Sequence, residues 1–193
     1  MEVVAICSSP RLKGNTATLV EALLEGARQA GATTTRFDPA KMKIGDCDAD
    51  RVCLESAEAG CIQDDDMQQI YAALKRAEAW VFAAPVYFWN VAAPMKRVVD
   101  RLYAFYTEEG GWRLGLEGTR KGAVIVVQAD GEQETPKRLA EYLASVMRDL
   151  KCDVIGQIAE GGIGDLGDAA KRPELIERAR GLGRELAGTG GAG

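Results

Sequence analysis

The chain has 193 residues, of which 47% are apolar and 27% are charged, and its formal net charge is -5. These values fit one globular domain of ordinary composition, and the negative balance argues against a nucleic-acid partner. The apolar run around Trp80–Trp89 is far too short to span a bilayer, so we expect no membrane association. The chain has no histidine, which excludes Ser-His-Asp and Cys-His triads and every His-ligated metal site.

Other features of the chain indicate its location and its domain limits. Glu2 stands where a signal peptide would carry positive charge, so we expect a cytoplasmic protein. Five cysteines, an odd number, argue against a disulfide framework and favour metal or redox roles. We expect one domain over residues 1–187, with an acidic cysteine-containing loop at 46–66 and a flexible tail at 188–193.

The chain alternates between short apolar runs, typical of buried strands, and segments whose apolar residues recur at helical spacing. The first strand is expected at Val3–Ile6 and the first helix at Thr16–Ala30, which Gly31 ends. The other strands are expected at Thr33–Asp38, Trp80–Ala84, Gly122–Val127 and Val154–Ile158. The other helices are expected to begin near Asp66, Pro94, Thr135 and Pro173.

This alternation predicts an α/β fold, a parallel sheet with helices on both faces, because parallel neighbours need crossover connections and these are helical. Five strands fit the flavodoxin-like doubly wound order 2-1-3-4-5. In such sheets, ligands bind beyond the carboxyl ends of the strands, at the switch point. The candidate ligand-binding loops are Ser8–Thr16, Pro85–Asn90 and Gln128–Glu134.

The first of these loops, SSPRLKGNT at residues 8–16, has the composition of an anion site. Its donors are the side chains of Ser8, Ser9, Asn15 and Thr16, and its positive charges are Arg11 and Lys13. The loop ends at a helix start, whose free N–H groups and dipole attract an anion. The pattern is neither GxxxxGK[ST] nor GxGxxG, so it argues against a nucleoside triphosphatase and a Rossmann dinucleotide site. A plain helix cap with solvated charges is the alternative.

The second and third loops add surfaces that suit a flat ring. Three aromatic residues, Tyr87, Phe88 and Trp89, directly follow a buried strand. They cannot all point into the core, so at least one is expected to face a ligand or a partner. The third loop, Gln128–Glu134, is short and polar and lies at the matching strand end. An anion site beside an aromatic surface predicts flavin mononucleotide (FMN) as the ligand.

With these loops in place, the sequence resembles the NADPH-dependent FMN reductase group of flavodoxin-like proteins, and within it the iron-sulfur flavoproteins. The resemblance runs in order over nearly the whole chain. Its matching pieces are SSPRLKGNT at 8–16, DDM at 65–67, APVYFWNVAAPMKRVVDRL at 84–102 and GDLGDAAKRPELIERARGLGREL at 164–186.

The resemblance implies FMN as the cofactor, NAD(P)H as the co-substrate, and a homodimer or homotetramer with the flavin near a subunit interface. It implies that the phosphate lies at Ser8, Ser9, Arg11, Asn15 and Thr16. It implies ring contacts from Pro85, Val86, Tyr87, Phe88, Trp89 and Asn90, and further contacts near Asp130 and Gly131. We name no proton-transfer residue, because a flavin carries this chemistry itself.

Cluster-binding members of the resembled branch carry a C-x2-C-x2-C-x4–7-C run in the loop at 46–66. Here Cys47, Cys53 and Cys61 occupy three of those positions, and Asp50 occupies the second. Since a [4Fe-4S] cluster normally takes four thiolates, we favour loss of the cluster. A cluster with Asp50 as its fourth ligand, a zinc ion held by the same four residues, and free thiols are the alternatives.

The leading functional hypothesis is an oxidoreductase that passes electrons from NAD(P)H through FMN to a quinone, flavin, nitro-compound, metal or protein acceptor. The second is an electron-transfer flavoprotein, with a [4Fe-4S] cluster on the cysteine loop and no small-molecule substrate. The acidic loop favours it slightly, because redox partners often dock by charge. The third is a flavodoxin-like scaffold that binds no flavin.

Overall fold

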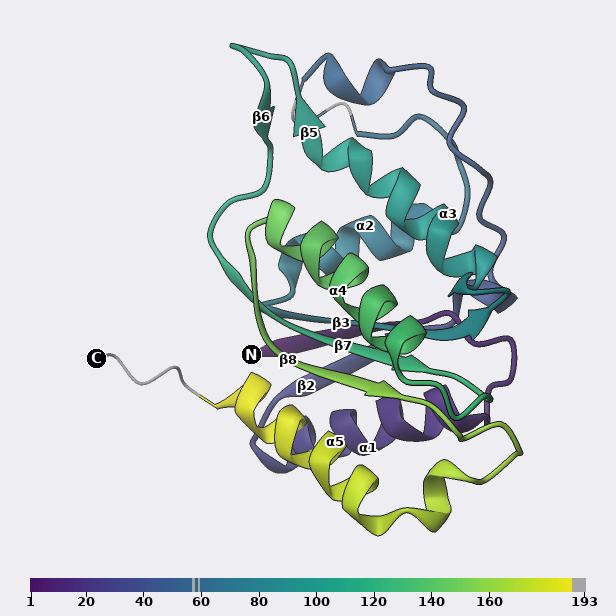
Figure 1. Ribbon diagram of the computed structural model, residues 1–193. Helices are drawn as coiled ribbons and strands as arrows, with labels where there is room; N and C mark the ends of the chain where they lie inside the picture. The colour runs from purple at the N-terminus through teal and green to yellow at the C-terminus, as the bar shows by residue number, and fades with distance from the viewer. Residues whose placement is uncertain (57, 59, 189–193) are drawn as a thin grey trace.

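A parallel sheet lies between two layers of helices in the computed structural model, which describes residues 1–56, 58 and 60–188 (Figure 1). Its strands are β1 (Glu2–Cys7), β2 (Thr33–Phe37), β3 (Ala79–Tyr87), β7 (Arg120–Val127) and β8 (Cys152–Glu160). They lie in the order β2-β1-β3-β7-β8, and each neighbouring pair is parallel. The predicted flavodoxin-like order 2-1-3-4-5 is confirmed.

Helices cover both faces of the sheet, as predicted (Figure 1). One face carries α1 (Asn15–Gln29) and α5 (Pro173–Ala187), and the other carries α2 (Met67–Arg76), α3 (Ala93–Arg101) and α4 (Glu134–Asp149). The connections contain η1 (Pro39–Lys41), η2 (Val52–Leu54), η3 (Leu102–Phe105), η4 (Ala169–Lys171), β4 (Asn90–Val91), β5 (Tyr106–Thr107) and β6 (Arg113–Leu114). Among the described residues, no helix combines the length and apolar character needed to cross a membrane. Apart from Gly188, the expected tail at 188–193 lies outside the described residues.

The core consists of two apolar layers separated by the sheet. Val4 and Ile6 of β1 belong to the layer under α2, α3 and α4, whereas Val3 and Ala5 belong to the layer under α1 and α5. Because successive side chains of a strand point to opposite faces, a strand covered on both faces needs apolar residues throughout. This requirement explains the uninterrupted apolar runs that predicted the strands.

The turn after β3 differs from the predicted loop. β3 continues to Tyr87 and pairs with the short antiparallel strand β4, so that Tyr87 faces Asn90 across a two-residue turn. The turn residues Phe88 and Trp89 both adopt the left-handed conformation, with φ of 51° and 58°. Such turns normally contain asparagine or glycine, because other residues are strained there. The sequence therefore carried no turn signal for this hairpin.

Candidate functional site

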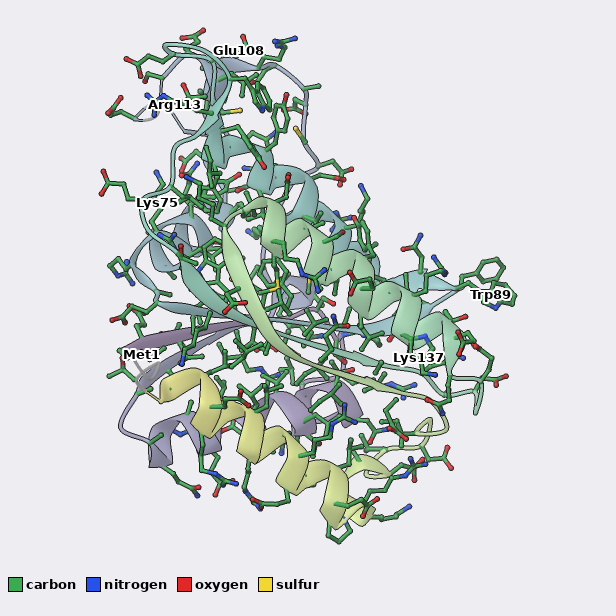
Figure 2. All side chains as sticks on the ribbon, turned by 60° about the vertical axis from the view of Figure 1, so that its left-hand side comes forward. Met1, Lys75, Trp89, Glu108, Arg113 and Lys137 are labelled. Atoms are coloured by element: carbon green, nitrogen blue, oxygen red, sulfur yellow. The ribbon has the colours of Figure 1, made fainter. Side chains whose placement is uncertain are left out.

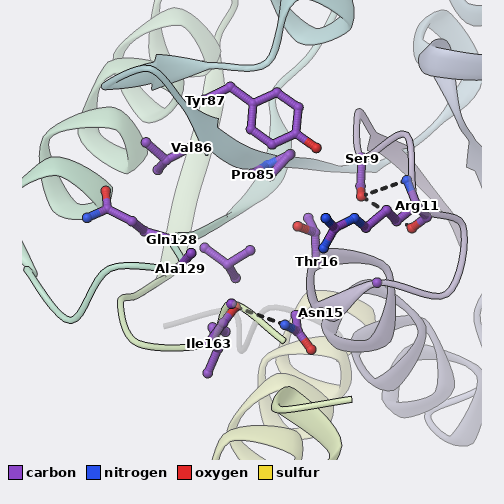
Figure 3. A pocket seen from close by; sticks show the side chains of 13 residues that line it. Ser9, Arg11, Asn15, Thr16, Pro85, Val86, Tyr87, Gln128, Ala129 and Ile163 are labelled. Atoms are coloured by element: carbon purple, nitrogen blue, oxygen red, sulfur yellow. Dashed lines mark hydrogen bonds between the residues drawn. The ribbon is translucent and has the colours of Figure 1, made fainter. Parts of the chain in front are cut away.

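A pocket of about 250 Å³ lies at the carboxyl ends of β1, β3 and β7, where the three predicted loops meet (Figure 3). Its lining residues are Ser9, Arg11, Gly14, Asn15, Thr16, Pro85, Val86, Tyr87, Val127, Gln128, Ala129, Ile163 and Gly164. The switch point of the sheet thus forms a pocket, as the predicted topology requires.

One end of the pocket is suited to an anion. α1 begins at Asn15, and its N-cap residue, Gly14, supplies no side-chain hydrogen bond to the first turn. The first N–H groups of an α-helix have no partner within the helix, so this end offers donors and the positive end of a dipole. The guanidinium of Arg11 extends into the pocket beside them (Figure 3). Ser9 fixes this loop, since its Oγ exchanges hydrogen bonds of 3.2 Å with the backbone N–H and carbonyl of Arg11.

Three polar side chains of the first loop are directed away from the anion end. Ser8 is fully buried, and its hydroxyl donates to the Ala83 carbonyl at 3.1 Å. Lys13 lines a different groove, between α1 and α5. The side-chain amide of Asn15 is fully engaged in hydrogen bonds to the segment after β8. Asn15 therefore offers the pocket its backbone N–H rather than its side chain.

Asn15 ties the first loop to the segment that follows β8. Its Nδ2 donates to the carbonyls of Ile163 and Asp165, both at 2.8 Å, and its Oδ1 accepts the N–H of Ala169 at 3.1 Å. The bond to Ile163 is drawn in Figure 3. Ile163 and Gly164 line the pocket, so the Asn15 amide fixes that wall of the pocket against the start of α1.

The hairpin after β3 contributes only part of its predicted set to the pocket. Pro85, Val86 and Tyr87 line it, and Tyr87 lies across from Arg11 (Figure 3). Phe88 and Trp89 are 92% and 66% exposed and pack edge to face against each other, with ring centroids 5.0 Å apart. Figure 2 shows Trp89 at the tip of the hairpin, directed away from the body of the protein. These two rings and Asn90 are not among the lining residues.

The third loop also contributes residues other than those predicted. Gln128 and Ala129 line the pocket, whereas Asp130 and Gly131 do not. The carbonyl of Asp130 instead accepts the N–H of Gly162 at 2.6 Å, and this hydrogen bond joins the third loop to the segment after β8. The predicted ring contacts of Asp130 and Gly131 remain predictions.

The wall formed by Ile163 and Gly164 was missed by the sequence analysis. A Cβ atom at Gly161 would lie 2.4 Å from the Glu132 carbonyl, and one at Gly164 would lie 2.8 Å from Cβ of Ala129. The segment after β8 thus approaches the third loop more closely than any larger residue allows. The run GGIG at 161–164 was the available signal, because clustered glycines often mark close backbone approach.

The cysteine loop, residues 46–66, borders a second cavity of about 280 Å³ between α3 and η2. The three cysteines of the loop line this cavity, together with Asp50 and Arg101. Cys47 is exposed, and Cys53 and Cys61 are half-buried. Burial raises the pKa of the Cys53 thiol, and the neighbouring thiol of Cys61 and carboxylate of Asp50 raise it further.

These residues do not form a cluster site as they stand. Among the described parts of the chain, no three Cys, Asp, Glu or His side chains are placed to hold a metal ion. Asp50 Oδ1 accepts the N–H of Val52 at 2.9 Å, and Cys61 Sγ accepts a hydrogen bond from Arg101 at 3.2 Å. The carboxylate at the second ligand position is therefore engaged by the backbone, and three thiols do not supply the four thiolates of a [4Fe-4S] cluster.

The contact between Asp65 and Arg101 predicts how this region responds to acid. Burial alone would raise the pKa of Asp65, but hydrogen bonds from Arg101 and from the Gly45 and Met67 N–H groups outweigh it and lower the pKa below its ordinary value. A carboxyl whose pKa is lowered by folding stabilises the fold above its unfolded-state pKa and loses that contribution as the pH falls through its folded-state pKa. Wild type should therefore exceed Asp65→Asn in thermal stability at neutral pH.

That stability difference should shrink only below about pH 4. Thermal melts of both proteins between neutral and acidic pH measure it. Asp46→Asn is the control, because Asp46 forms an exposed ion pair with Arg97 and should change stability little at any pH. A constant difference between wild type and Asp65→Asn down to the most acidic melt would contradict the assignment.

A doubly wound sheet with a pocket at its switch point, suited to an anion at one end and apolar at the other, defines a protein of the flavodoxin-like class. Comparison with known proteins then gives the family. The family model of NADPH-dependent FMN reductases matches residues 1–161. The chain belongs to this family and is an oxidoreductase of the NAD(P)H-dependent FMN reductase type.

Relatives and solved structures agree with this assignment. An iron-sulfur flavoprotein of Archaeoglobus fulgidus is 29% identical over 189 residues, covering 97% of this chain and 79% of that protein. One from Methanocaldococcus jannaschii is 34% identical over 140 residues, covering 72% and 68%. The structure of an NAD(P)H:quinone oxidoreductase from Methanothermobacter marburgensis superposes with a TM-score of 0.70 at 25% identity, covering 96% of this chain and 98% of that one.

Proposed function

We propose that this protein binds FMN in the pocket at the carboxyl ends of β1, β3 and β7. It would use the cofactor to pass electrons from NAD(P)H to a small-molecule or protein acceptor. The observation that carries the proposal is the composition of the pocket. Unpaired helix N–H groups and Arg11 lie at one end, and the apolar wall of Pro85 to Tyr87 lies at the other. That pairing suits a phosphate joined to a flat ring.

The protein's residues bind and orient the cofactor in this proposal. The start of α1 and Arg11 hold the phosphate, while Ser9 keeps the loop in its shape. Tyr87 and Val86 flank the ring on one side, and Ile163 lies on the facing wall. When bound, FMN supplies the chemistry of accepting a hydride from a nicotinamide and releasing two electrons. The acceptor in this proposal is a quinone, a flavin, a nitro-compound, a metal or a protein.

A pair of ligands that differ only in the phosphate tests the site. FMN and riboflavin are titrated against the protein, and dissociation constants are measured by quenching of flavin fluorescence. Wild type should bind FMN roughly 100-fold more tightly than riboflavin, because charge-assisted bonds to the phosphate contribute only with FMN. Equal affinity for the two ligands would show that no phosphate site exists.

Arg11→Gln and Lys13→Gln form a matched pair, since both remove one positive charge from the same loop. Arg11→Gln should weaken FMN binding about 10-fold and leave riboflavin binding unchanged. Lys13→Gln should alter neither, because Lys13 lines the groove between α1 and α5 rather than this pocket. Equal weakening by both changes would mean that general charge, rather than the position of Arg11, attracts the ligand.

Anaerobic reduction distinguishes the reductase from the electron-transfer flavoprotein. If the protein is a reductase, NADH or NADPH bleaches the bound flavin, and a quinone or nitro-compound then restores its colour. The second candidate is favoured by the names of the relatives and by the acidic cysteine loop. If it holds, neither nicotinamide bleaches the flavin, and a redox titration resolves two separate one-electron steps.

We also propose that the protein assembles as a homodimer or homotetramer. The exposed rings of Phe88 and Trp89 support it, because large apolar side chains gathered at one tip often lie in protein interfaces. Sedimentation analysis of the FMN-loaded protein measures the assembly. A monomer at micromolar concentration would contradict this part of the proposal and leave the flavin site untouched.

A further inference from the structure

Arg101, the last residue of α3, is only 2% exposed although it carries a charge. Its Nη1 donates to the Gly45 carbonyl at 3.1 Å, to Gln63 Oε1 at 2.7 Å and to Asp65 Oδ2 at 2.8 Å. These partners stand near the two ends of the cysteine loop, so one side chain joins both ends. Its Nη2 donates to Cys61 Sγ at 3.2 Å and thereby fixes one of the three thiols.

The remaining cysteines of the chain cannot supply a fourth thiolate to this loop. Cys7 is buried in the layer under α1 and α5, on the opposite face of the sheet. Cys152 is buried at the start of β8, and burial raises the pKa of its thiol to about 12. Neither lines the cavity beside the cysteine loop. In the part of the loop that the structure describes, the acidic and thiol groups lining the cavity are three thiols and the carboxylates of Asp48 and Asp50.

A [4Fe-4S] cluster takes four thiolates and joins the chain segments that carry them. In this protein the guanidinium of Arg101 already joins Gly45, just before the loop, to Cys61, Gln63 and Asp65 at its far end. We infer that Arg101 closes the cysteine loop in place of an iron-sulfur cluster, and that Cys47, Cys53 and Cys61 remain free thiols. This chain would thus differ from the iron-sulfur flavoproteins to which it is similar. Its further consequence, which rests on the proposed function, is that electrons leave at the flavin pocket rather than through the loop.

Metal analysis combined with thiol labelling tests this inference separately from flavin binding. The protein is purified without oxygen, incubated with ferrous iron and sulfide, and desalted. Iron, zinc and acid-labile sulfide are then measured, and thiols are mapped by mass spectrometry after maleimide labelling. We expect no stoichiometric metal or sulfide, with Cys47, Cys53 and Cys61 labelled in the folded protein and the two buried cysteines only after unfolding. About four irons and four sulfides per chain, or one zinc, with the loop thiols protected, would overturn the inference.

Arg101→Met and Arg97→Met test what closes the loop. Both arginines lie on α3, but Arg97 contacts the loop only through an exposed ion pair with Asp46, which contributes little. Trypsin cleavage after Arg51, inside the loop, should become about 10-fold faster in Arg101→Met, because the hydrogen bonds that close the loop are lost. Arg97→Met should be cleaved at the wild-type rate. Cleavage of Arg101→Met at the wild-type rate would overturn the inference.

An iron chelator tests whether a metal closes the loop in the wild-type protein, so this experiment does not depend on whether a variant folds. Wild-type cleavage after Arg51 is followed with and without a strong iron chelator under reducing conditions. An unchanged rate supports closure by Arg101, whereas faster cleavage with the chelator means that a metal holds the loop. Flavin absorbance recorded in the same samples reports the FMN site independently, so failure of one proposal is distinguishable from failure of the other.

Discussion

Replacing Gly183 with alanine is expected to lower the free energy of unfolding by about 3 kcal/mol. A Cβ atom at this position would lie 1.8 Å from the backbone oxygen of Leu23 on α1. The approach is mutual, because a Cβ atom at Gly26 would lie 2.1 Å from the backbone oxygen of Arg180 on α5. The obstacle is backbone on both sides, so the two helices must move apart and loosen the apolar layer beneath them.

Denaturant titration of wild type and the variant measures this loss. Gly181→Ala is the matched control, since it lies on the same helix and a Cβ atom there would meet only Arg184, at 3.8 Å. Alanine there should leave stability unchanged or raise it by up to about 1 kcal/mol, because glycine is a poor helix former. If both variants unfolded at the same denaturant concentration, the two helices would not approach as closely as described.

The same layered core explains why the fold was predictable from the sequence. A strand covered on both faces must be apolar throughout. The segments Val3–Ile6 and Trp80–Ala84 are uninterrupted apolar runs, so the sequence alone predicted two strands of this kind. Helices on the faces carry apolar residues at helical spacing, and Gly31 marked the end of the first one. Local composition thus determined the elements, and the handed crossover rule left few ways to connect them. The placement of Arg11 beside the start of α1 was predictable for the same reason, since the two are neighbours in the chain.

The residues that form the walls of the pocket could not be predicted, because their placement depends on contacts between residues far apart in the sequence. Ser8 looked like a phosphate donor, but its hydroxyl bonds to Ala83, a neighbour only across the sheet. Phe88 and Trp89 looked like ring contacts, but a strained turn directs them outward. The facing wall comes from Ile163, which lies 148 positions from Asn15, its hydrogen-bond donor. A hydrogen bond between distant segments leaves only a weak signal in the sequence, such as an isolated polar residue or a run of glycines.

Asn15→Ala is expected to weaken FMN binding roughly 10- to 100-fold, since each backbone group left without a partner costs about 1–3 kcal/mol. The change removes bonds to two carbonyls and one N–H in the segment of residues 163–169. The wall carrying Ile163 and Gly164 would then no longer be fixed against the start of α1. Because Asn15 would keep its backbone N–H, a weaker affinity would reflect the lost tether rather than a lost phosphate donor. FMN titration by fluorescence measures the effect.

Riboflavin and two further variants separate the tether from the phosphate contact. Riboflavin binding should weaken with Asn15→Ala as well, because the wall faces the ring, whereas Arg11→Gln should affect FMN alone. Asn15→Asp should be no better than Asn15→Ala, since a carboxylate accepts the N–H of Ala169 but repels the two carbonyls. Thr18→Ala is the neutral control, because its hydroxyl bonds to the carbonyl of the N-cap residue Gly14, which the backbone N–H of Thr18 continues to hold. If Asn15→Ala weakened FMN but not riboflavin, the Asn15 amide would itself contact the phosphate, as the sequence resemblance implies.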